Sequence, residues 1–134
     1  MDRVFLDANV LFSVACGEES GLLRLWGRRN VEVCTSAYAV EEAKRNLPHD
    51  DQRGRLAALL RQTRVLPESP PSSDLPPDVR LVEKDAPILL AAIHGGATHL
   101  LTGDIRHFGS LLGRQIAGVW VLRPATYLRR SVRP

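Results

Sequence analysis

The sequence predicts an α/β fold, a single domain with one open parallel β-sheet flanked by helices. Short apolar segments bounded by Gly, Pro, Asn or Asp alternate along the whole chain with segments whose apolar residues recur every three or four positions. This alternation is typical of strands and helices in a parallel sheet. The chain has 134 residues, of which 44% are hydrophobic, as expected of one domain with its own core.

Four segments are predicted to be strands, because each is rich in β-branched or large apolar residues and lies between turn-forming residues. They are residues 3–7, 31–35, 98–102 and 119–122. Between them, apolar residues at helical spacing predict four helices. These cover residues 21–29, 37–47, 51–63 and 86–94. Ser36 is placed to cap the second of these helices, and Pro48 follows its end.

One domain is predicted over residues 1–128, followed by a flexible C-terminal tail at residues 129–134. The proline-rich segment at residues 67–77 is interpreted as a surface loop within that domain. Neither half of the chain would bury a core alone, so this loop is not expected to be a domain boundary.

Arginine side chains provide most of the positive charge, and the net charge is +3 at pH 7 with neutral histidine. A mildly basic protein is compatible with a polyanionic partner such as RNA. Charge does not establish such a partner, because a general abundance of arginine would give the same balance. The planar guanidinium nevertheless matches phosphate better than an ammonium group does.

The expected compartment is the cytoplasm, with no membrane contact. No apolar run approaches the roughly 18 residues that a membrane-spanning helix needs. The first residues lack the apolar core and cleavage site of a signal peptide. Cys16 and Cys34 have no CxxC spacing and lie among apolar residues, which predicts buried thiols in a reducing environment.

Two aspartates follow predicted strands. Asp7 ends the first strand, and Asp104 comes just after the third. Ligands of open parallel sheets bind outside the carboxyl ends of the strands, so both side chains are candidates for one site. Asn9 could reach the same crevice from the first turn of the following helix. The alternative is that Asp7 or Asn9 only caps that helix.

Two further acids could join them. Asp85 falls in line with the inward-facing residues of the helix at 86–94, where a carboxylate must be capped, paired or bound to metal. Pro87 also makes Asp85 a plausible helix cap, and both roles are compatible. Glu41 and Glu42 flank the buried face of their helix, and periodicity does not choose between them. Either could instead be a solvated glutamate paired with a neighbouring basic residue.

Converging carboxylates repel one another and raise each other's pKa values. A hard divalent cation with oxygen ligands, Mg²⁺ or Mn²⁺, is the usual resolution. Such an ion activates water and stabilises the charge of a phosphate under attack. The acids therefore indicate a metal-dependent phosphodiesterase chemistry.

Three segments resemble the motifs of the PIN domain family. Residues 5–11 contain a D-x-N pattern after an apolar strand, and residues 35–47 resemble the helix that carries an essential glutamate. Residues 85–104 resemble the last two motifs, an aspartate-initiated helix, a glycine turn and a strand ending in T-x-D. The resemblance implies a Rossmannoid PIN-like fold and a metal-dependent ribonuclease that hydrolyses RNA phosphodiester bonds. Compact members similar to virulence-associated protein C are toxins of type II toxin–antitoxin pairs, and many are homodimers.

The resemblance assigns roles to individual residues. It makes four acids both catalytic and metal-binding, namely Asp7, Glu42, Asp85 and Asp104. Glu42 is favoured over Glu41 because the family glutamate precedes a helical leucine by about one and a half turns, as Glu42 precedes Leu47. Asn9 and Thr102 match polar positions that orient the acids or a water.

RNA contacts are predicted from basic residues beside the motifs. These are Arg45, Arg106 and His107, with Arg53 or Arg55 as further candidates. Residues 105–108 lack the additional acid that some family members carry there, which argues against a second metal ion more than against the first.

Three other interpretations compete with this one. A PIN fold could bind RNA or a protein without cutting. A phosphatase of the haloacid dehalogenase type would use Asp7 as a nucleophile, but it requires a second aspartate where Asn9 stands. In the third interpretation all four acids are caps and surface charges, which their order and spacing disfavour.

Overall fold

A computed structural model describes residues 1–17, 20–70 and 73–131. It contains a six-stranded sheet with the order β3-β2-β1-β4-β6-β5, in which only β5 runs antiparallel to its neighbour. The strands are β1 (Asp2–Leu6), β2 (Val31–Ser36), β3 (Arg64–Leu66), β4 (His99–Leu101), β5 (Gln115–Ile116) and β6 (Val119–Leu122). The predicted fold class is confirmed.

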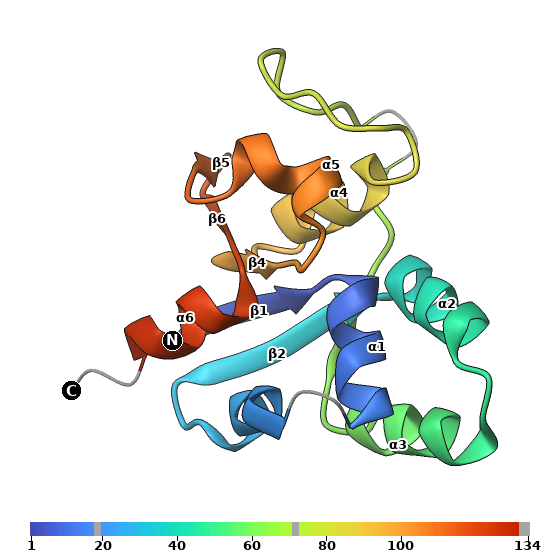
Figure 1. The fold of residues 1–134 in the computed structure, drawn as a ribbon. Helices are drawn as coiled ribbons and strands as arrows, with labels where there is room; N and C mark the ends of the chain where they lie inside the picture. Colours follow the sequence, from blue (N-terminus) through green and yellow to red (C-terminus); the bar gives the residue numbers. More distant parts are fainter. Residues whose placement is uncertain (18–19, 71–72, 132–134) are drawn as a thin grey trace.

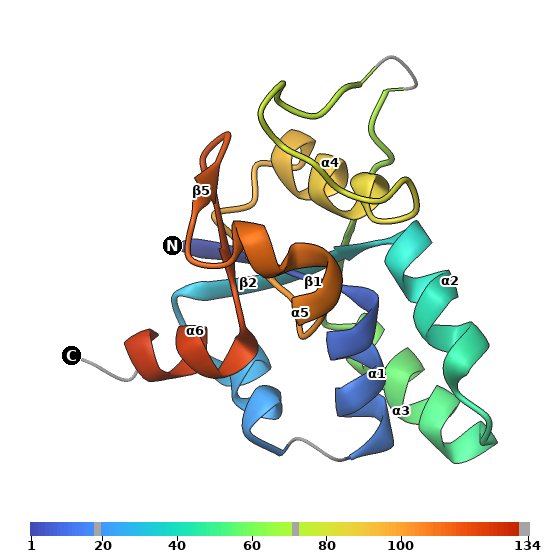
Figure 2. The same cartoon turned by 45° about the horizontal axis from the view of Figure 1, so that its top comes forward.

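The helices of the described residues connect these strands. They are α1 (Ala8–Cys16), α2 (Ala37–Asn46), α3 (Asp50–Leu60), α4 (Ala86–His94), α5 (Ile105–Phe108) and α6 (Pro124–Ser131), with 3-10 helices η1 (Ser20–Gly27) and η2 (Gly109–Leu111). Helix α4 lies on one side of the sheet, whereas α1, α3 and η1 lie on the other (Figures 1 and 2). Helix α2 stands beyond the carboxyl ends of β1 and β2 and packs against α1 and α4.

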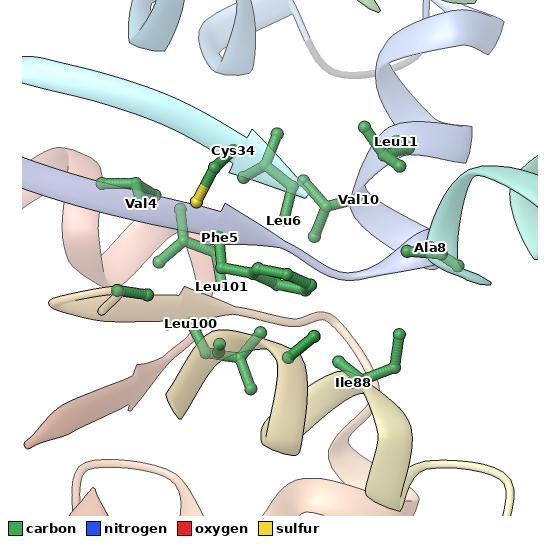
Figure 3. Packing of buried hydrophobic residues seen from close by; sticks show 14 of the residues in the cluster. Val4, Phe5, Leu6, Ala8, Val10, Leu11, Cys34, Ile88, Leu100 and Leu101 are labelled. Atoms are coloured by element: carbon green, nitrogen blue, oxygen red, sulfur yellow. The ribbon is translucent and has the colours of Figure 1, made fainter. Parts of the chain in front are cut away.

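The core lies on both faces of the central strands. Val4, Phe5 and Leu6 of β1 are fully buried in succession, as expected of a parallel strand that helices cover on both sides. Figure 3 shows Phe5 and Leu100 near Ile88 of α4, with Val10 and Leu11 of α1 across the sheet. This packing fixes the position of the strand ends that carry the acids.

Some local predictions are confirmed and others are corrected. The segment predicted as a helix at residues 21–29 is the 3-10 helix η1. The predicted cap is confirmed, because the Ser36 side chain accepts a hydrogen bond from the Ala39 amide at 3.2 Å. The two cysteines form no disulfide. Cys34 is buried as predicted, whereas Cys16 is only half-buried.

A helix extends into the segment that the sequence analysis assigned to the C-terminal tail. Helix α6 continues to Ser131, so residues 129–131 of the predicted tail are helical, and residues 132–134 lie outside the described residues. Tyr127 anchors this helix, because its side chain is buried and its hydroxyl donates a hydrogen bond to Asp2 at 2.7 Å. Of the helices within the described ranges, none is both long enough and apolar enough to cross a membrane.

Candidate metal centre

Asp7 and Asp104 are joined through Thr102 at the carboxyl ends of β1 and β4. Leu6 pairs with Leu101 in the sheet, so Asp7 and Thr102 emerge side by side. The buried Thr102 hydroxyl donates to Asp7 Oδ2 at 2.8 Å and accepts from the Asp104 amide at 3.0 Å. One hydroxyl therefore fixes the two acids relative to each other.

Asn9 closes the same network from the first turn of α1. Its amide nitrogen donates to Asp7 Oδ2 at 3.1 Å, and its oxygen accepts from the Gly103 amide at 2.8 Å. Asp7 also accepts from the Ala8 amide at 2.7 Å, so it caps α1 as well as facing the crevice. Asn9 and Thr102, which were predicted to orient the acids, thus both donate hydrogen bonds to Asp7.

Asp85 is buried at the start of α4 but does not cap it. Its side chain makes no capping hydrogen bond, although the residue is only 6% exposed. Its Oδ2 atom is buried and has no hydrogen-bond partner among the described residues. The simple capping role that the sequence left open is therefore not observed, and a buried carboxylate oxygen without a hydrogen bond favours a nearby cation or a proton.

Tyr38 holds the segment that leads to Asp85. Its hydroxyl donates a hydrogen bond to the Lys84 carbonyl at 2.6 Å, which ties α2 to the residue before Asp85. Burial raises the pKa of Tyr38, and the charges of Glu42 and Asp85 raise it further. Tyr38 was not identified from the sequence, because no sequence motif marks a tyrosine in the first turn of a helix as part of a site.

The structure separates the two neighbouring glutamates. Glu42 is half-buried and lines a pocket together with Asp7 and Asp85. Glu41 is exposed and lies 3.8 Å from the Lys44 ammonium, outside that pocket. Position on the helix therefore distinguishes the residues that periodicity left equivalent.

His107 turns inward between two of the acids. Its Nδ1 atom lies 2.9 Å from Asp85 Oδ2 and 2.9 Å from Asp104 Oδ2. Its backbone amide donates to Asp104 Oδ1 at 3.0 Å, so Asp104 caps the short helix α5 and the imidazole is held beside the carboxylate. The sequence placed His107 among the RNA contacts, whereas the structure points its ring at the carboxylates.

These side chains surround an open pocket of about 470 Å³ at the carboxyl end of the sheet. Figure 2 shows α1, α2, α4 and α5 gathered around this end. The pocket is lined by Asp7, Ala8, Asn9, Phe12, Glu42, Asn46, Lys84, Asp85 and Asp104. All four predicted acids thus converge on one pocket.

The electrostatics of the pocket are those of crowded, buried carboxylates. Burial raises the pKa of Asp7 to about 6, despite the opposing hydrogen bonds from Thr102 and Ala8. The charges of Asp85 and Glu42 raise it further. Burial also raises the pKa of Asp85, with His107 acting in the opposite direction. The pocket therefore favours the binding of positive charge.

The predicted arginine contacts lie outside this pocket. Arg45 and Arg106 are exposed and do not line it. Arg53 and Arg55 are tied to the backbone carbonyls of Leu47 and Ala15 through hydrogen bonds of 3.0 and 2.8 Å. The basic residues that line the pocket or the groove beside it are therefore different ones.

A second, larger groove of about 740 Å³ adjoins the pocket and shares Asn9 and Asp104 with it. Arg123 and Arg129 line this groove and are exposed. Both belong to the C-terminal region around α6, which carried no motif. Lys84, in the pocket itself, was also not identified from the sequence.

The donor set fits a divalent cation. Carboxylate oxygens are the preferred ligands of Mg²⁺ and Mn²⁺. Ligand atoms of Asp85, Asp104 and His107 all lie within 4.8 Å of one another. Asp85 Oδ2, which has no hydrogen-bond partner among the described residues, is one of the atoms beside His107. The fold and the site together define an α/β domain with an acidic candidate metal centre at the carboxyl ends of its sheet.

The family model described as the PIN domain matches residues 3–106, and the chain belongs to this family. PIN nucleases generally use a divalent metal, and the acidic cluster is a candidate site for one. A solved structure of similar fold, with a TM-score of 0.60, is the crystal structure of VapBC2 from Rickettsia felis bound to a DNA fragment from their promoter. The two chains are 14% identical over 90% of this chain and 98% of the other. No match was found among curated proteins.

Proposed function

We propose that this chain is a divalent-metal-dependent endoribonuclease that hydrolyses RNA phosphodiester bonds. The observation that carries the proposal is the convergence of Asp7, Glu42, Asp85 and Asp104 on one open pocket in a PIN domain. The cation expected there is Mg²⁺ or Mn²⁺.

The acidic residues would hold the cation, and their neighbours would keep them in place. When bound, the ion lowers the pKa of a water and offsets charge on the scissile phosphate. Thr102 and Asn9 orient Asp7 through the hydrogen bonds described above. Because these groups are already positioned, little reorganisation is needed when substrate binds.

Basic side chains outside the acids would bind the RNA backbone. Lys84 lines the pocket itself, and Arg123 and Arg129 line the adjoining groove. Arginine matches phosphate geometry well and carries no base preference when it contacts phosphate alone. These three residues are better placed for phosphate contact than Arg45 or Arg106.

The proposal includes a role as the toxin of a type II toxin–antitoxin pair. The similar fold of VapBC2 and the sequence resemblance to virulence-associated protein C support this role. We further propose a cognate antitoxin that covers the pocket, and a homodimer in solution. Light scattering of the purified chain tests the homodimer, and inhibition by the product of an adjacent gene tests the antitoxin.

Cleavage of end-labelled total tRNA tests the enzymatic proposal. Wild-type protein is incubated with Mn²⁺, Mg²⁺ or EDTA beside two variants, Asp104→Asn and Glu41→Gln. Glu41→Gln is the matched control, because it removes an exposed acid outside the pocket. We expect metal-dependent cutting by wild type and by Glu41→Gln only.

Cutting that persists in EDTA or in folded Asp104→Asn would contradict the proposed chemistry. RNA binding without cutting, under any metal and with messenger and ribosomal RNA as well, would favour the non-catalytic PIN module. Circular dichroism shows that each variant is folded.

A further inference from the structure

The position of His107 gives the metal centre a nitrogen donor. Its Nδ1 atom is buried and lies 2.9 Å from one oxygen of Asp85 and one of Asp104. We propose that Asp85, Asp104 and His107 bind one divalent cation together, and that the imidazole makes this site prefer a first-row transition ion such as Mn²⁺ to Mg²⁺. The inference refines the metal requirement of the proposed nuclease.

His107 and Asp85 lie at ion-pair distance but make no hydrogen bond to each other. Neither His107 Nδ1 nor Asp85 Oδ2 has a hydrogen-bond partner of acceptable geometry among the described residues. A single N–H cannot make a linear hydrogen bond to each of two carboxylates that lie equally near. A cation between the three side chains would contact the nitrogen and both oxygens at once.

The spacing of the donor atoms also fits one ion. Ligands about 2.1 Å from an octahedral ion lie about 3.0 Å apart when they are adjacent. The two nitrogen-to-oxygen distances are 2.9 Å, and all three ligand atoms lie within 4.8 Å of one another. The described side chains therefore need little movement to coordinate a single ion.

Burial provides an independent reason for a ligand at this place. Asp85 is 6% exposed, and its Oδ2 receives no hydrogen bond. A buried charged oxygen without donors is costly, and a metal ion removes that cost. Asp7 does not share this need, because Thr102, Asn9 and Ala8 already donate to it. The ion is therefore assigned to the side of the pocket that contains Asp85.

The nitrogen donor determines the selectivity. Mg²⁺ is bound by oxygen ligands and water, whereas imidazole nitrogen suits transition ions. His107 stands in the short segment 105–108, which contains no carboxylate. An imidazole in place of a carboxylate lowers the negative charge available to Mg²⁺ and supplies a softer ligand for its competitor.

Mn²⁺ binding to the metal-free protein, without RNA, tests the inference. Electron paramagnetic resonance counts free Mn²⁺ in the titration, and competition with Mg²⁺ gives the ratio of the two dissociation constants. Electron spin echo measurements on the bound ion detect a coordinated ¹⁴N nucleus directly. The variants are His107→Ala and His107→Asp, and His94→Ala is the control because His94 is an exposed histidine of α4.

We expect the ¹⁴N modulation in wild type and in His94→Ala, and its loss in both His107 variants. The preference for Mn²⁺ over Mg²⁺ should fall about tenfold in His107→Ala. His107→Asp should strengthen Mg²⁺ binding and remove the preference for Mn²⁺, because it replaces a nitrogen ligand by an oxygen ligand. Thermal unfolding in EDTA shows whether each variant is folded.

Two results would overturn the inference. The first is a wild-type spectrum without nitrogen coupling. The second is a gain in affinity for both ions in His107→Ala, which would mean that His107 only competes with the cation for Asp85 and Asp104. These outcomes leave the nuclease proposal standing if RNA is still cut. Nitrogen-coupled Mn²⁺ in a protein that cuts no RNA would instead preserve the inference and refute the nuclease.

Discussion

Asp7 and Asp85 are buried to nearly the same extent, with 3% and 6% of their surface exposed, but the protein treats them differently. Asp7 receives hydrogen bonds from Thr102, Asn9 and the Ala8 amide. Asp85 Oδ2 receives none and faces His107 and Asp104. The carboxylate on one side of the pocket is therefore held by hydrogen bonds from the protein itself, whereas an oxygen on the other side has no hydrogen bond and is the better candidate to bind a ligand.

The two sides also differ in the elements that build them. Asp7 and Thr102 follow adjacent, register-paired strands of a fully buried sheet. Asp85 directly precedes α4 and His107 lies in α5, and these helices pack on the sheet from one side. The strand ends therefore hold Asp7 and Thr102 in place before any ligand binds. The side with Asp85 and His107 would be completed by the bound ion.

The largest expected effect comes from Asp85→Asn. It should lower the single-turnover rate of RNA cleavage at least about 100-fold, because it removes a charged ligand from the side that would bind the ion. The same variant should remain folded in EDTA, since an amide tolerates burial better than an unpaired carboxylate. Retention of more than about a tenth of the rate would show that Asp85 is not essential to metal binding.

Asp7→Asn should change the pH dependence of stability. Folded Asp7, with a pKa near 6, holds its proton more tightly than the unfolded chain does. Its contribution therefore lowers wild-type stability as the pH rises from about 4 to about 6. The free energy of unfolding of the variant, relative to wild type, should rise by roughly 3 kcal/mol across this interval.

Urea unfolding in EDTA at pH 4 and pH 8 measures this difference between Asp7→Asn and wild type. Burial is the main cause of the raised pKa, and repulsion from Asp85 and Glu42 is the smaller part. A pH-independent difference would mean that Asp7 titrates normally, which would remove the contrast between the two sides.

Thr102→Val tests how far the side with Asp7 depends on one hydroxyl. The substitution preserves shape but removes a donor to Asp7 and an acceptor for the Asp104 amide. The buried Asp7 carboxylate and the half-buried Asp104 amide each lose a partner, which should lower the free energy of unfolding by about 1–3 kcal/mol. Thr35→Val is the comparison, because the buried Thr35 hydroxyl donates a single hydrogen bond to the Leu6 carbonyl. Equal losses in the two variants would argue against a linking role for Thr102.

The smallest effects are expected in the groove. Arg123→Ala or Arg129→Ala should weaken binding of single-stranded RNA several-fold and lower the salt dependence by about one counterion each. Arg61→Ala is the control, because Arg61 lines a different surface near Met1 and Val31. Filter binding at several salt concentrations distinguishes them. Identical losses for all three variants would mean that only net charge matters.

The residues of the pocket that follow strand ends were largely predictable from the sequence. Asp7, Asn9, Thr102 and Asp104 lie within four residues of a strand end, and parallel strands bring such ends together. The convergence of Asp85 with them followed from helix periodicity only in part, because the same position also predicted a simple cap.

The remaining features depend on contacts that sequence patterns do not encode. The inward rotation of His107 follows from capping by Asp104, and Tyr38 acts through a backbone carbonyl of a distant segment. Strands β3 and β5 each contain only one buried residue, so neither forms the apolar run by which the other strands were predicted. Helix α6 was missed because its anchor, Tyr127, pairs with Asp2 at the other end of the chain.

A crystal structure of the protein with Mn²⁺, in which anomalous scattering locates the ion, tests most directly whether the ion binds on the Asp85 side of the pocket rather than at Asp7. We expect an anomalous peak within coordination distance of Asp85 Oδ2, Asp104 Oδ2 and His107 Nδ1, with the hydrogen bonds of Asp7 to Thr102 and Asn9 retained. A peak bound to Asp7 alone, or none in the pocket at saturating Mn²⁺, would contradict it.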